Sequence, residues 1–524
     1  MVGNETQRVL AETEREQGRK ALRNNVAAAV ALAGAVRTTL GPSGMDKMLV
    51  DEAGMSLVTN DGVTVLETAK VEHPTARMLI STSSAQDAEA KDGTTTTVVL
   101  TAELLVNALE LVDRGVHPAV VATGFRAAAA EVPTALAEIA HEVKGREDRI
   151  AATLTSLSGK GDAGMRSILS ELAVDAAAAV ESDEQVRVIH RRSGIVTDSN
   201  LVQGLVLAKQ KVHREMPERS EGGKVLILDG GIERRSPAIE ASLRITQPGA
   251  IQAFHTRERE ELARKVQVLA DAGVALLIVR DGIEDDAHVM LADAGIIAYR
   301  RVEREDLEHI ARATGATPLH DVDNVRSEDL GAFTELREEK WEGREHMVLI
   351  GSEEAGVTLV LHGSTESRLA ECERAFIDAL GVACGLEEEP ALLPGAGATQ
   401  IALARRLRRF AETIPGREQM AVDAFAAALE VIPRILAQNA GLDPIDELLR
   451  VTAAQSSDGD DWLGLNILTG EITDMGDAGV TEPVRITRQA ISGATDAAIA
   501  VLRIDDTLWA RKDAEEPDWQ TSED

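Results

Sequence analysis

The sequence has little cysteine and no long apolar run. Only two cysteines, Cys372 and Cys384, occur in 524 residues, and on one helix they would lie roughly 18 Å apart, too far for a disulfide. We therefore expect both to be reduced core residues. No uninterrupted run of 18 apolar residues is present, and the polar N-terminus lacks the apolar centre of a secretory signal. A soluble, cytoplasmic protein is predicted.

Positive charge is also scarce. Lysine and arginine number 55 against 88 aspartates and glutamates, giving a formal net charge of -33. A nucleic-acid binder needs a positive face to release counterions, so nucleic acid is not an expected partner. Because no long apolar run is present, a membrane is not expected either. Lysine supplies only 12 of the 55 basic residues. Such an acidic surface suits high salt, which screens its self-repulsion, and is typical of a salt-accumulating organism.

The chain is too long for one core, so two to four domains are expected. Residues 17–40 and 118–140 are alanine-rich with apolar positions at helical spacing. In contrast, short apolar runs occur in the middle of the chain, at 223–233, 274–283 and 295–302, and they predict a central α/β module. A helix is predicted again from Ser364, its expected N-cap, with one apolar stripe of Leu369, Cys372, Phe376, Ala379 and Ala383. One simple arrangement inserts the mixed middle into a helical domain.

The stretch QDAEAKDGTTTTVVL (86–100) has the composition of a phosphate site. Asp92 and Gly93 precede four threonines at a predicted helix start, where unpaired N–H groups, hydroxyls and a Mg²⁺-binding carboxylate can meet a phosphate. An ordinary threonine-capped helix explains this segment equally well. Further Gly-rich or acidic turns occur at 38–51, 58–67 and 392–407.

Four motifs of this sequence resemble, in their order along the chain, those of the group II chaperonins, the thermosome-type family. They are TTLGPSGMDKMLVD, VTNDGVTVLE, DGTTT and LLPGAGATQ. The resemblance runs from about residue 8 to 511 and includes LRITQPGAIQAF at 243–254. The longer stretch 243–279 is similar to the segment that forms the built-in lid protrusion of that family.

The resemblance implies a multidomain α and α/β chaperonin fold. Three domains are implied. A discontinuous helical equatorial domain would comprise 1–146 and 394–524, and a hinge-like intermediate domain 147–215 and 364–393. An inserted apical α/β domain with a helical lid protrusion would comprise 216–363.

The resemblance also implies the function of an ATP-dependent molecular chaperone. Such a subunit encloses unfolded polypeptides in a double ring and promotes folding by hydrolysing ATP with Mg²⁺, with K⁺ as a further candidate ion. Its partners would be identical or paralogous ring subunits and unfolded client chains.

Family roles can be carried onto matching positions of this sequence. Asp92 would bind Mg²⁺, Asp378 would activate the attacking water, and Asp61 would orient it. The residues that would bind the nucleotide are Thr39, Leu40, Gly41, Pro42, Gly93, Thr94, Thr95, Thr96, Lys160, Gly397, Asn466, Ile467 and Glu482. Among them, Lys160 would sense the terminal phosphate, Glu482 would contact the ribose, and Asn466 and Ile467 would pack the base.

Three simpler interpretations compete with these roles. Asp378 lies off the apolar stripe of its helix, so periodicity alone predicts a solvated carboxylate. Lys160 by itself fits an exposed, flexible lysine. The segment GKGDAG (159–164) formally matches a dinucleotide fingerprint, although no acid closes a following strand.

The sequence departs from the family at several positions. Lys91 and Ala396 replace glycines, and Ser43 replaces a lysine; Lys91 either adds positive charge near phosphate or crowds a backbone that needs glycine, at about 1–3 kcal/mol. Where the family has proline and glutamates at an expected subunit-contact surface, this chain has Thr399, Gln400 and Ala402. An alternative function is therefore a weakly hydrolysing or non-hydrolysing ring subunit, structural or regulatory in mixed rings or acting as a holdase. A third hypothesis is a soluble phosphotransferase. Such an enzyme would also need a pocket for the molecule that accepts the phosphate, and the sequence shows no second group of residues that could form one.

Overall fold

The computed structural model describes residues 13–50, 54, 56–233, 250–341, 343–352, 356–456 and 459–510. The chain forms two compact units. Unit 1 combines both chain ends, Met1–Ser170 and Ile377–Asp524, and unit 2 is the inserted middle, Glu171–Phe376. The predicted insertion of a mixed module into a helical one agrees with this division, whereas the three-domain boundaries stay a prediction.

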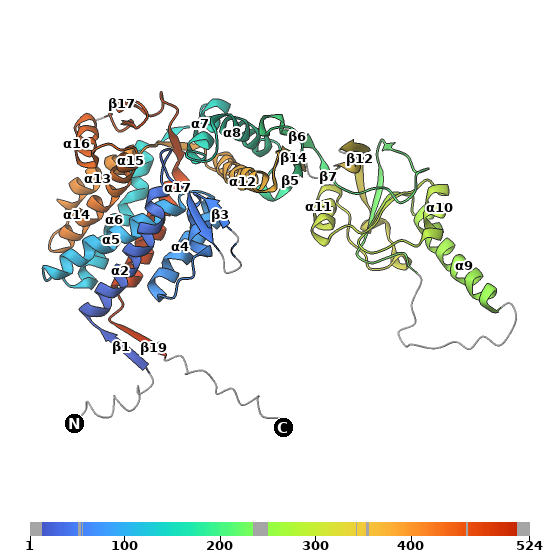
Figure 1. Cartoon of the computed structure of the whole chain (residues 1–524), viewed down its shortest axis with the longest axis horizontal. Coiled ribbons are helices and arrows are strands. Elements are labelled where there is room, and N and C mark those ends of the chain that lie inside the picture. The colour runs from blue at the N-terminus through green and yellow to red at the C-terminus, as the bar shows by residue number, and fades with distance from the viewer. Residues whose placement is uncertain are drawn as a thin grey trace, which may run out of the picture. The chain divides into compact units, whose positions relative to one another are not determined.

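Unit 1 is built around α5 (Thr94–Asp113), which packs against α2, α4, α14 and α17. Helices from the two ends of the chain therefore share one hydrophobic core, and Figure 1 shows the blue and red helices side by side. The other helices of unit 1 are α2 (Arg19–Val36), η1 (Arg37–Thr39), α3 (Gly62–Thr68), α4 (Pro74–Ala90), α6 (Pro118–Ile139), α7 (Arg146–Ser156), α13 (Ala398–Ala411), α14 (Glu418–Leu429), α15 (Val431–Asn439), α16 (Pro444–Ala454) and α17 (Val484–Leu502). Helix α8 (Ala163–Ala177) runs from unit 1 into unit 2.

Short strands complete unit 1. The first and last described strands, β1 (Thr13–Gln17) and β19 (Asp506–Ala510), pair antiparallel. The remaining pairings are β2 (Lys47–Val50) with β3 (Ser56–Thr59), β16 (Leu463–Asn466) with β17 (Glu471–Asp474), and β15 (Ala391–Pro394) between β18 (Thr481–Pro483) and β4 (His141–Glu142).

Helix α5 is an exception to the expectation that no segment of the chain is long and apolar enough to cross a bilayer. By length and composition alone it could cross a membrane, but 61% of its apolar window is buried inside the protein. It is the central helix of unit 1, and its apolar residues contact other helices of the core.

Unit 2 contains one large sheet of strand order β11-β10-β9-β12-β13-β7, with β8 paired to β12. The predicted runs at 223–233, 274–283 and 295–302 form its parallel strands β9 (Gly223–Leu228), β10 (Val274–Val279) and β11 (Ile297–Tyr299), whose apolar side chains are buried on both faces. The antiparallel strands are β12 (Gly331–Trp341), β13 (Arg344–Gly351), β7 (Leu205–Leu207) and β8 (Arg219–Ser220).

Helices and a second sheet complete unit 2. The helices are α9 (Ala250–Asp271), α10 (Asp285–Asp293), α11 (Arg304–Thr314) and the single turns η2 (Asp183–Gln185), η3 (Val196–Asp198), η4 (Val322–Asn324) and η5 (Ser327–Asp329). The small sheet has β14 (Val357–His362) between β5 (Val186–Arg191) and β6 (Asn200–Gln203). Residues 243–249 of the predicted lid segment 243–279 lie outside the described residues, as does the C-terminal tail, and the rest of the segment contains α9 and β10.

Helix α12 (Glu366–Glu388) starts in unit 2 and ends in unit 1. All five residues of its predicted apolar stripe are buried, which confirms the periodicity. Both cysteines lie on this helix; Cys372 is a buried core residue as predicted, whereas Cys384 is only half-buried. The predicted cap is wrong by one residue, because Thr365, and not Ser364, accepts a hydrogen bond from the Arg368 amide through its Oγ1, at 3.3 Å.

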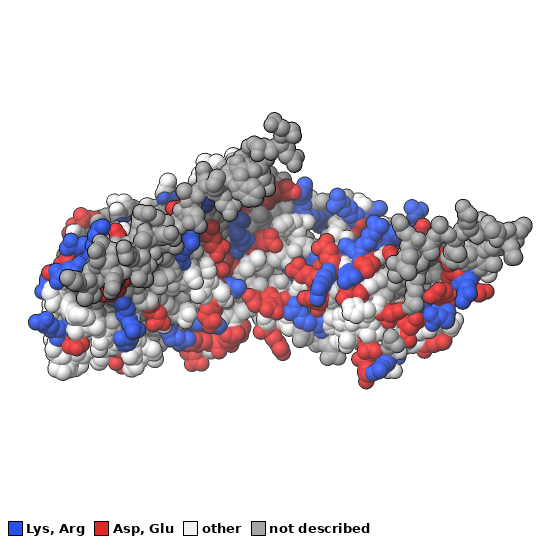
Figure 2. Space-filling view, turned by 90° about the horizontal axis from the view of Figure 1, so that it is seen from below, with Lys and Arg blue, Asp and Glu red and all other residues white. Residues whose placement is uncertain are grey.

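Acidic and basic side chains lie intermixed on the face that Figure 2 shows. Many arginines form ion pairs with carboxylates, such as Arg406 with Asp461 and Arg488 with Glu389. Local pairing therefore offsets part of the negative charge of the chain.

Candidate nucleotide site

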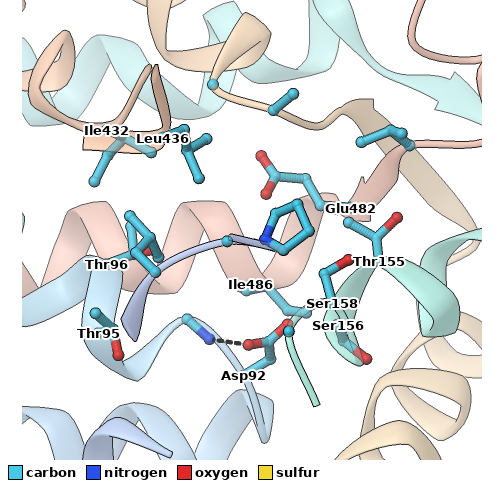
Figure 3. Close-up of a pocket in the computed structure, with 18 of the residues that line it drawn as sticks. Asp92, Thr95, Thr96, Thr155, Ser156, Ser158, Ile432, Leu436, Glu482 and Ile486 are labelled. Carbon is cyan, nitrogen blue, oxygen red and sulfur yellow. Dashed lines mark hydrogen bonds between the residues drawn. The ribbon is translucent and has the colours of Figure 1, made fainter. Parts of the chain in front are cut away.

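A cavity of about 390 Å³ lies in unit 1 and is lined by segments from both chain ends. Figure 3 shows Thr95 and Thr96 on one side of it, Thr155, Ser156 and Ser158 on the other, and Asp92 below. Every predicted nucleotide or metal residue lines this cavity, as does Asp61: Thr39, Leu40, Gly41, Pro42, Asp92, Gly93, Thr94, Thr95, Thr96, Lys160, Gly397, Asn466, Ile467 and Glu482. Asp378 joins the group through an ion pair with Lys160. The individual roles of these residues stay predictions.

The N-terminus of α5 opens into the cavity. Its N-cap is Gly93, in the left-handed region at φ 81°, and no side chain caps the helix. The simple threonine-capped interpretation is therefore wrong, because Thr97 Oγ1 instead donates back to the Gly93 carbonyl at 3.0 Å. The first amides of a helix have no partner within it, so this end offers N–H groups and a positive dipole to an anion.

Neighbouring helices hold the turn before α5 in place. The Gln86 side chain of α4 donates to the Asp92 carbonyl at 2.8 Å and to the Ile486 carbonyl of α17 at 3.4 Å. Asp92 Oδ1 accepts from the Gly93 amide at 2.6 Å (Figure 3). The carboxylate is thus fixed beside the open end of the helix.

Asp61 is the N-cap of α3 and lies next to this turn. Its Oδ2 accepts from the Thr64 amide at 2.9 Å and from the Thr64 hydroxyl at 2.5 Å. A side chain at Gly62 would begin 2.3 Å from Thr95 Oγ1. The two helix starts are therefore packed against each other, with Asp61 on the cavity wall.

Asp378 and Lys160 form an ion pair, with side chains only 22% and 19% exposed. This corrects the simpler interpretations of a solvated carboxylate and a flexible lysine. Burial lowers the pKa of Lys160, but the carboxylates of Asp378, Asp92 and Asp61 together outweigh burial and raise this pKa above its usual value. Burial raises the pKa of Asp378, and Asp61 adds to the rise, although Lys160 opposes both. Arg166 holds the lysine loop by donating to the carbonyls of Lys160 and Gly161, at 3.2 and 2.8 Å.

The acids of the site share one electrostatic environment. Burial raises the pKa of Asp92 to about 6; Lys160 opposes the rise, and Asp378 and Asp61 add to it. Such a group of carboxylates favours a bound cation. Within the described residues no three His, Cys, Asp or Glu side chains are placed to hold a metal ion. The donor set fits Mg²⁺, which binds through one or two carboxylates together with phosphate oxygens and water.

Apolar side chains of α15 and α17 also line the cavity. Figure 3 shows Ile432 and Leu436 of α15 together, where they provide a surface suited to a flat base, and Ile486 of α17 nearer to Asp92. Elsewhere on the lining, on β18, burial raises the pKa of Glu482 to about 7. Gln400 Nε2 donates to Glu482 Oε1 at 3.5 Å.

Sequence reasoning missed several lining residues. The hydroxyls of Thr155, Ser156 and Ser158 lie just before Lys160, and Asn60 donates to the Gly159 carbonyl at 2.7 Å. The sequence feature that could have indicated these lining residues is the run TSLS before GKG, in which small polar residues precede a glycine turn. Because GKGDAG follows helix α7 and not a strand, the dinucleotide interpretation lacks its required context.

Two departures from the family pattern have a structural cost. Lys91 and Ala396 adopt φ angles of 56° and 55°, in the left-handed region that favours glycine. Each is expected to cost about 1–2 kcal/mol relative to a relaxed backbone. Nothing in the structure explains Ser43.

The expectation that Thr399, Gln400 and Ala402 lie on a contact surface is wrong. All three are buried in unit 1, and Thr399 Oγ1 donates to the Pro394 carbonyl at 2.7 Å. These residues lie at the start of α13, inside the helical core, so their side chains act within the subunit.

Comparison with known proteins agrees with this arrangement. Residues 32–512 match the TCP-1/cpn60 chaperonin family. The chain belongs to this chaperonin family. It is 42% identical to thermosome subunit beta of Methanothermobacter thermautotrophicus, over 95% of this chain and 93% of that one. Among haloarchaeal chaperonins, it is 41% identical to thermosome subunit 1 of Haloferax volcanii, with 95% and 90% covered, and 41% identical to thermosome subunit alpha of Halobacterium salinarum, with 97% and 92% covered.

Proposed function

We propose that this chaperonin subunit hydrolyses ATP with Mg²⁺ and uses the reaction to fold polypeptides enclosed in a double ring. The observation that carries the proposal is the cavity that joins the open end of α5, Asp92 and Lys160, with Asp378 held next to it by its ion pair with Lys160. Its proposed partners are identical or paralogous subunits and unfolded client chains, in the cytoplasm. The relatives are named thermosome subunits, which supports the assembly into rings.

Nucleotide binding would use backbone and hydroxyl groups. The amides and hydroxyls of Thr94, Thr95 and Thr96 would bond phosphate oxygens at the helix start. Glycine at position 41 allows close approach of the chain, since a side chain there would begin 2.4 Å from Leu436 Cδ2. The apolar wall of Ile432 and Leu436 would hold the base.

Asp92 would hold the metal ion, which when bound neutralises phosphate charge. Lys160 would turn from Asp378 toward the terminal phosphate, because the two groups compete for one ammonium. The freed Asp378 carboxylate would take a proton from water oriented by Asp61. The water oxygen would then bond to the terminal phosphorus as the bond to the bridging oxygen breaks, giving ADP and phosphate.

The test is Mg²⁺-dependent ATP hydrolysis by the purified assembly in molar KCl. Asp378→Asn keeps the shape of the side chain but removes the base, so turnover should fall by roughly 10²–10⁴-fold while ADP still binds. Glu371→Gln, a more exposed carboxylate on the same helix, is the matched control and should keep its turnover. Equal turnover in the natural chain and Asp378→Asn would remove Asp378 from the mechanism.

The weakly hydrolysing ring subunit remains a second candidate. The positive φ angles of Lys91 and Ala396 favour it, because both residues flank the nucleotide loops. It predicts little turnover by the natural chain and a gain in Lys91→Gly or Ala396→Gly. Absence of nucleotide binding in the natural chain and in both variants would contradict both candidates.

A further inference from the structure

We propose that Gln400 determines the sugar specificity of the nucleotide site: its side-chain oxygen accepts a hydrogen bond from a sugar hydroxyl and thereby selects ribose over deoxyribose. The inference rests on the proposed function and deepens it. It concerns a position at which this chain departs from the family, which has a glutamate there.

Gln400 comes from the first turn of α13. The N-cap of this helix, Gly397, has no side-chain cap. A glutamine three residues after the N-cap can turn back and accept from the N-cap amide, in the arrangement called a capping box. Within the described chain Gln400 does not form this bond, and it lines the cavity although it is only 5% exposed. Its amide is therefore used for a contact outside its own helix.

The contact with Glu482 decides which end of the Gln400 amide remains available. Gln400 Nε2 donates to Glu482 Oε1 at 3.5 Å, near the upper limit for such a bond. A carboxyl group keeps an accepting oxygen with or without a proton, so this contact does not require Glu482 to be ionised. The other end of the amide, Oε1, is buried and has no hydrogen-bond partner among the described residues. A ligand that donates an O–H or N–H group would satisfy it.

The place of Glu482 in the cavity indicates which part of the nucleotide carries this donor. Figure 3 shows Glu482 apart from Ile432, on the surface that would hold the base, and apart from Asp92 below, where the phosphates would lie. The sugar joins the base to the phosphates in every nucleotide, so it is the part left for Glu482 and Gln400. Ribose has O–H donors on two neighbouring carbons, C2′ and C3′, and the two side chains offer it two neighbouring acceptors.

Binding constants for ADP, 2′-deoxy-ADP and 3′-deoxy-ADP measure the hydroxyl preference directly. The purified assembly is titrated calorimetrically with each nucleotide and Mg²⁺ in molar KCl. The natural chain should bind ADP about tenfold more tightly than either deoxy form, because loss of a hydroxyl leaves a buried acceptor unpaired. Gln400→Met has a similar size but no amide. In it, the preference for one hydroxyl should fall below about twofold, while the preference for the other hydroxyl, held by Glu482, should remain.

Three further variants separate recognition of the sugar from effects on the fold. Gln400→Asn stays polar but is shorter, so it should lose the same preference as Gln400→Met. Gln400→Glu keeps an accepting oxygen at the same reach and should keep the preference.

Gln455 provides the matched control. It is also a buried glutamine whose Oε1 has no partner in the described part of the chain, but it is not among the described residues that line the cavity. Its Nε2 donates to the Leu463 carbonyl at 2.8 Å. Gln455→Met should therefore lower the unfolding midpoint and leave both hydroxyl preferences as in the natural chain.

The remaining outcomes all count against the inference. Equal binding of the three nucleotides by the natural chain, or both preferences kept in Gln400→Met, removes Gln400 from sugar recognition. An equal loss in Gln455→Met assigns the preference to core packing. If Gln400→Met instead reduces the preference for ADP over purine riboside diphosphate, which lacks the adenine amine, Gln400 reads the base. If the natural chain binds no ADP, the proposed function fails as well, whereas normal ADP binding with unchanged preferences overturns the inference alone.

Discussion

At the scale of single residues, Glu482 shows how burial sets the charge of a site. Its carboxyl lines the cavity beside Gln400, and burial raises its pKa to about 7 from an ordinary value of 4.5. Near neutral pH this group is therefore divided between its neutral and ionised forms.

The stability of the protein should depend on pH through Glu482. Because its folded pKa exceeds its unfolded pKa, the folded state holds the proton more tightly, and this stabilisation is complete below about pH 4.5 and lost as pH rises to about 7. Glu482→Gln is neutral throughout, so we expect it to be more stable than the natural chain at pH 8, by on the order of 2–3 kcal/mol, but not at pH 4.5. Chemical unfolding midpoints at both pH values check this.

A second carboxyl provides a control of opposite sign. Arg488 holds the pKa of Glu389 below its usual range. Its stabilisation is present above about pH 4.5 and is lost as the pH falls further. Glu389→Gln should therefore weaken the protein at pH 8. If both variants change stability in the same direction at pH 8, the assignment for Glu482 is wrong.

Residue identities were predictable from sequence, but residue partners were not. Motif resemblance marked Asp378 and Lys160, yet 218 positions separate them along the chain. Periodicity describes one helix and cannot show what another segment brings to its polar side. For the same reason Lys91 was recognised as a departure from the family, while its contact with Gly381 required the folded chain.

At the scale of elements, close helix packing depends on small residues. Gly124 of α6 lies against α14, where an added Cβ would be 2.5 Å from Ala421 Cβ and 2.7 Å from the Glu418 carbonyl. Gly34 of α2 has no atom within 4 Å of the same position. Gly124 is thus closely packed against a neighbouring helix, whereas Gly34 has open space beside it.

Alanine substitution should separate these two sites. Gly34→Ala should stabilise the protein by about 0.5–1 kcal/mol, because alanine favours a helix more than glycine does. Gly124→Ala should instead destabilise it by about 1–3 kcal/mol, because backbone and Ala421 must move apart. Urea unfolding of the two variants measures both effects. A similar gain in both would show that α6 and α14 are less closely packed than described.

Helices and buried strands were the elements that sequence predicted well. Alanine-rich periodicity located α2 and α6, and apolar runs located β9, β10 and β11. The start of α12 was misplaced, because Ser364 and Thr365 are both suitable caps and only the backbone decides between them. The burial of Thr399 and Gln400 was missed, because a polar side chain in the sequence does not show which helices cover it.

At the scale of the whole molecule, the net charge of -33 favours expansion of the chain. Salt screens this repulsion, with a Debye length of about 10 Å at 0.1 M and about 3 Å at 1 M. We expect the thermal unfolding midpoint to rise steeply between 0.1 and 1 M KCl and to level off above that. NaCl should give the same curve, since screening depends on ionic strength. A midpoint independent of salt would show that local ion pairs already balance the charge.

The order of the two units along the chain has a consequence for synthesis on the ribosome. Strand β1 pairs with β19, Thr13 beside Ala510, so unit 1 cannot be completed until almost the whole chain has been made. At about 5–20 residues per second, the first strand waits for its partner for roughly 25–100 s. Unit 2 is continuous and can fold during this time. The nascent protein therefore passes through a stage in which its middle is folded while α2 and α5 still lack the helices that will cover them.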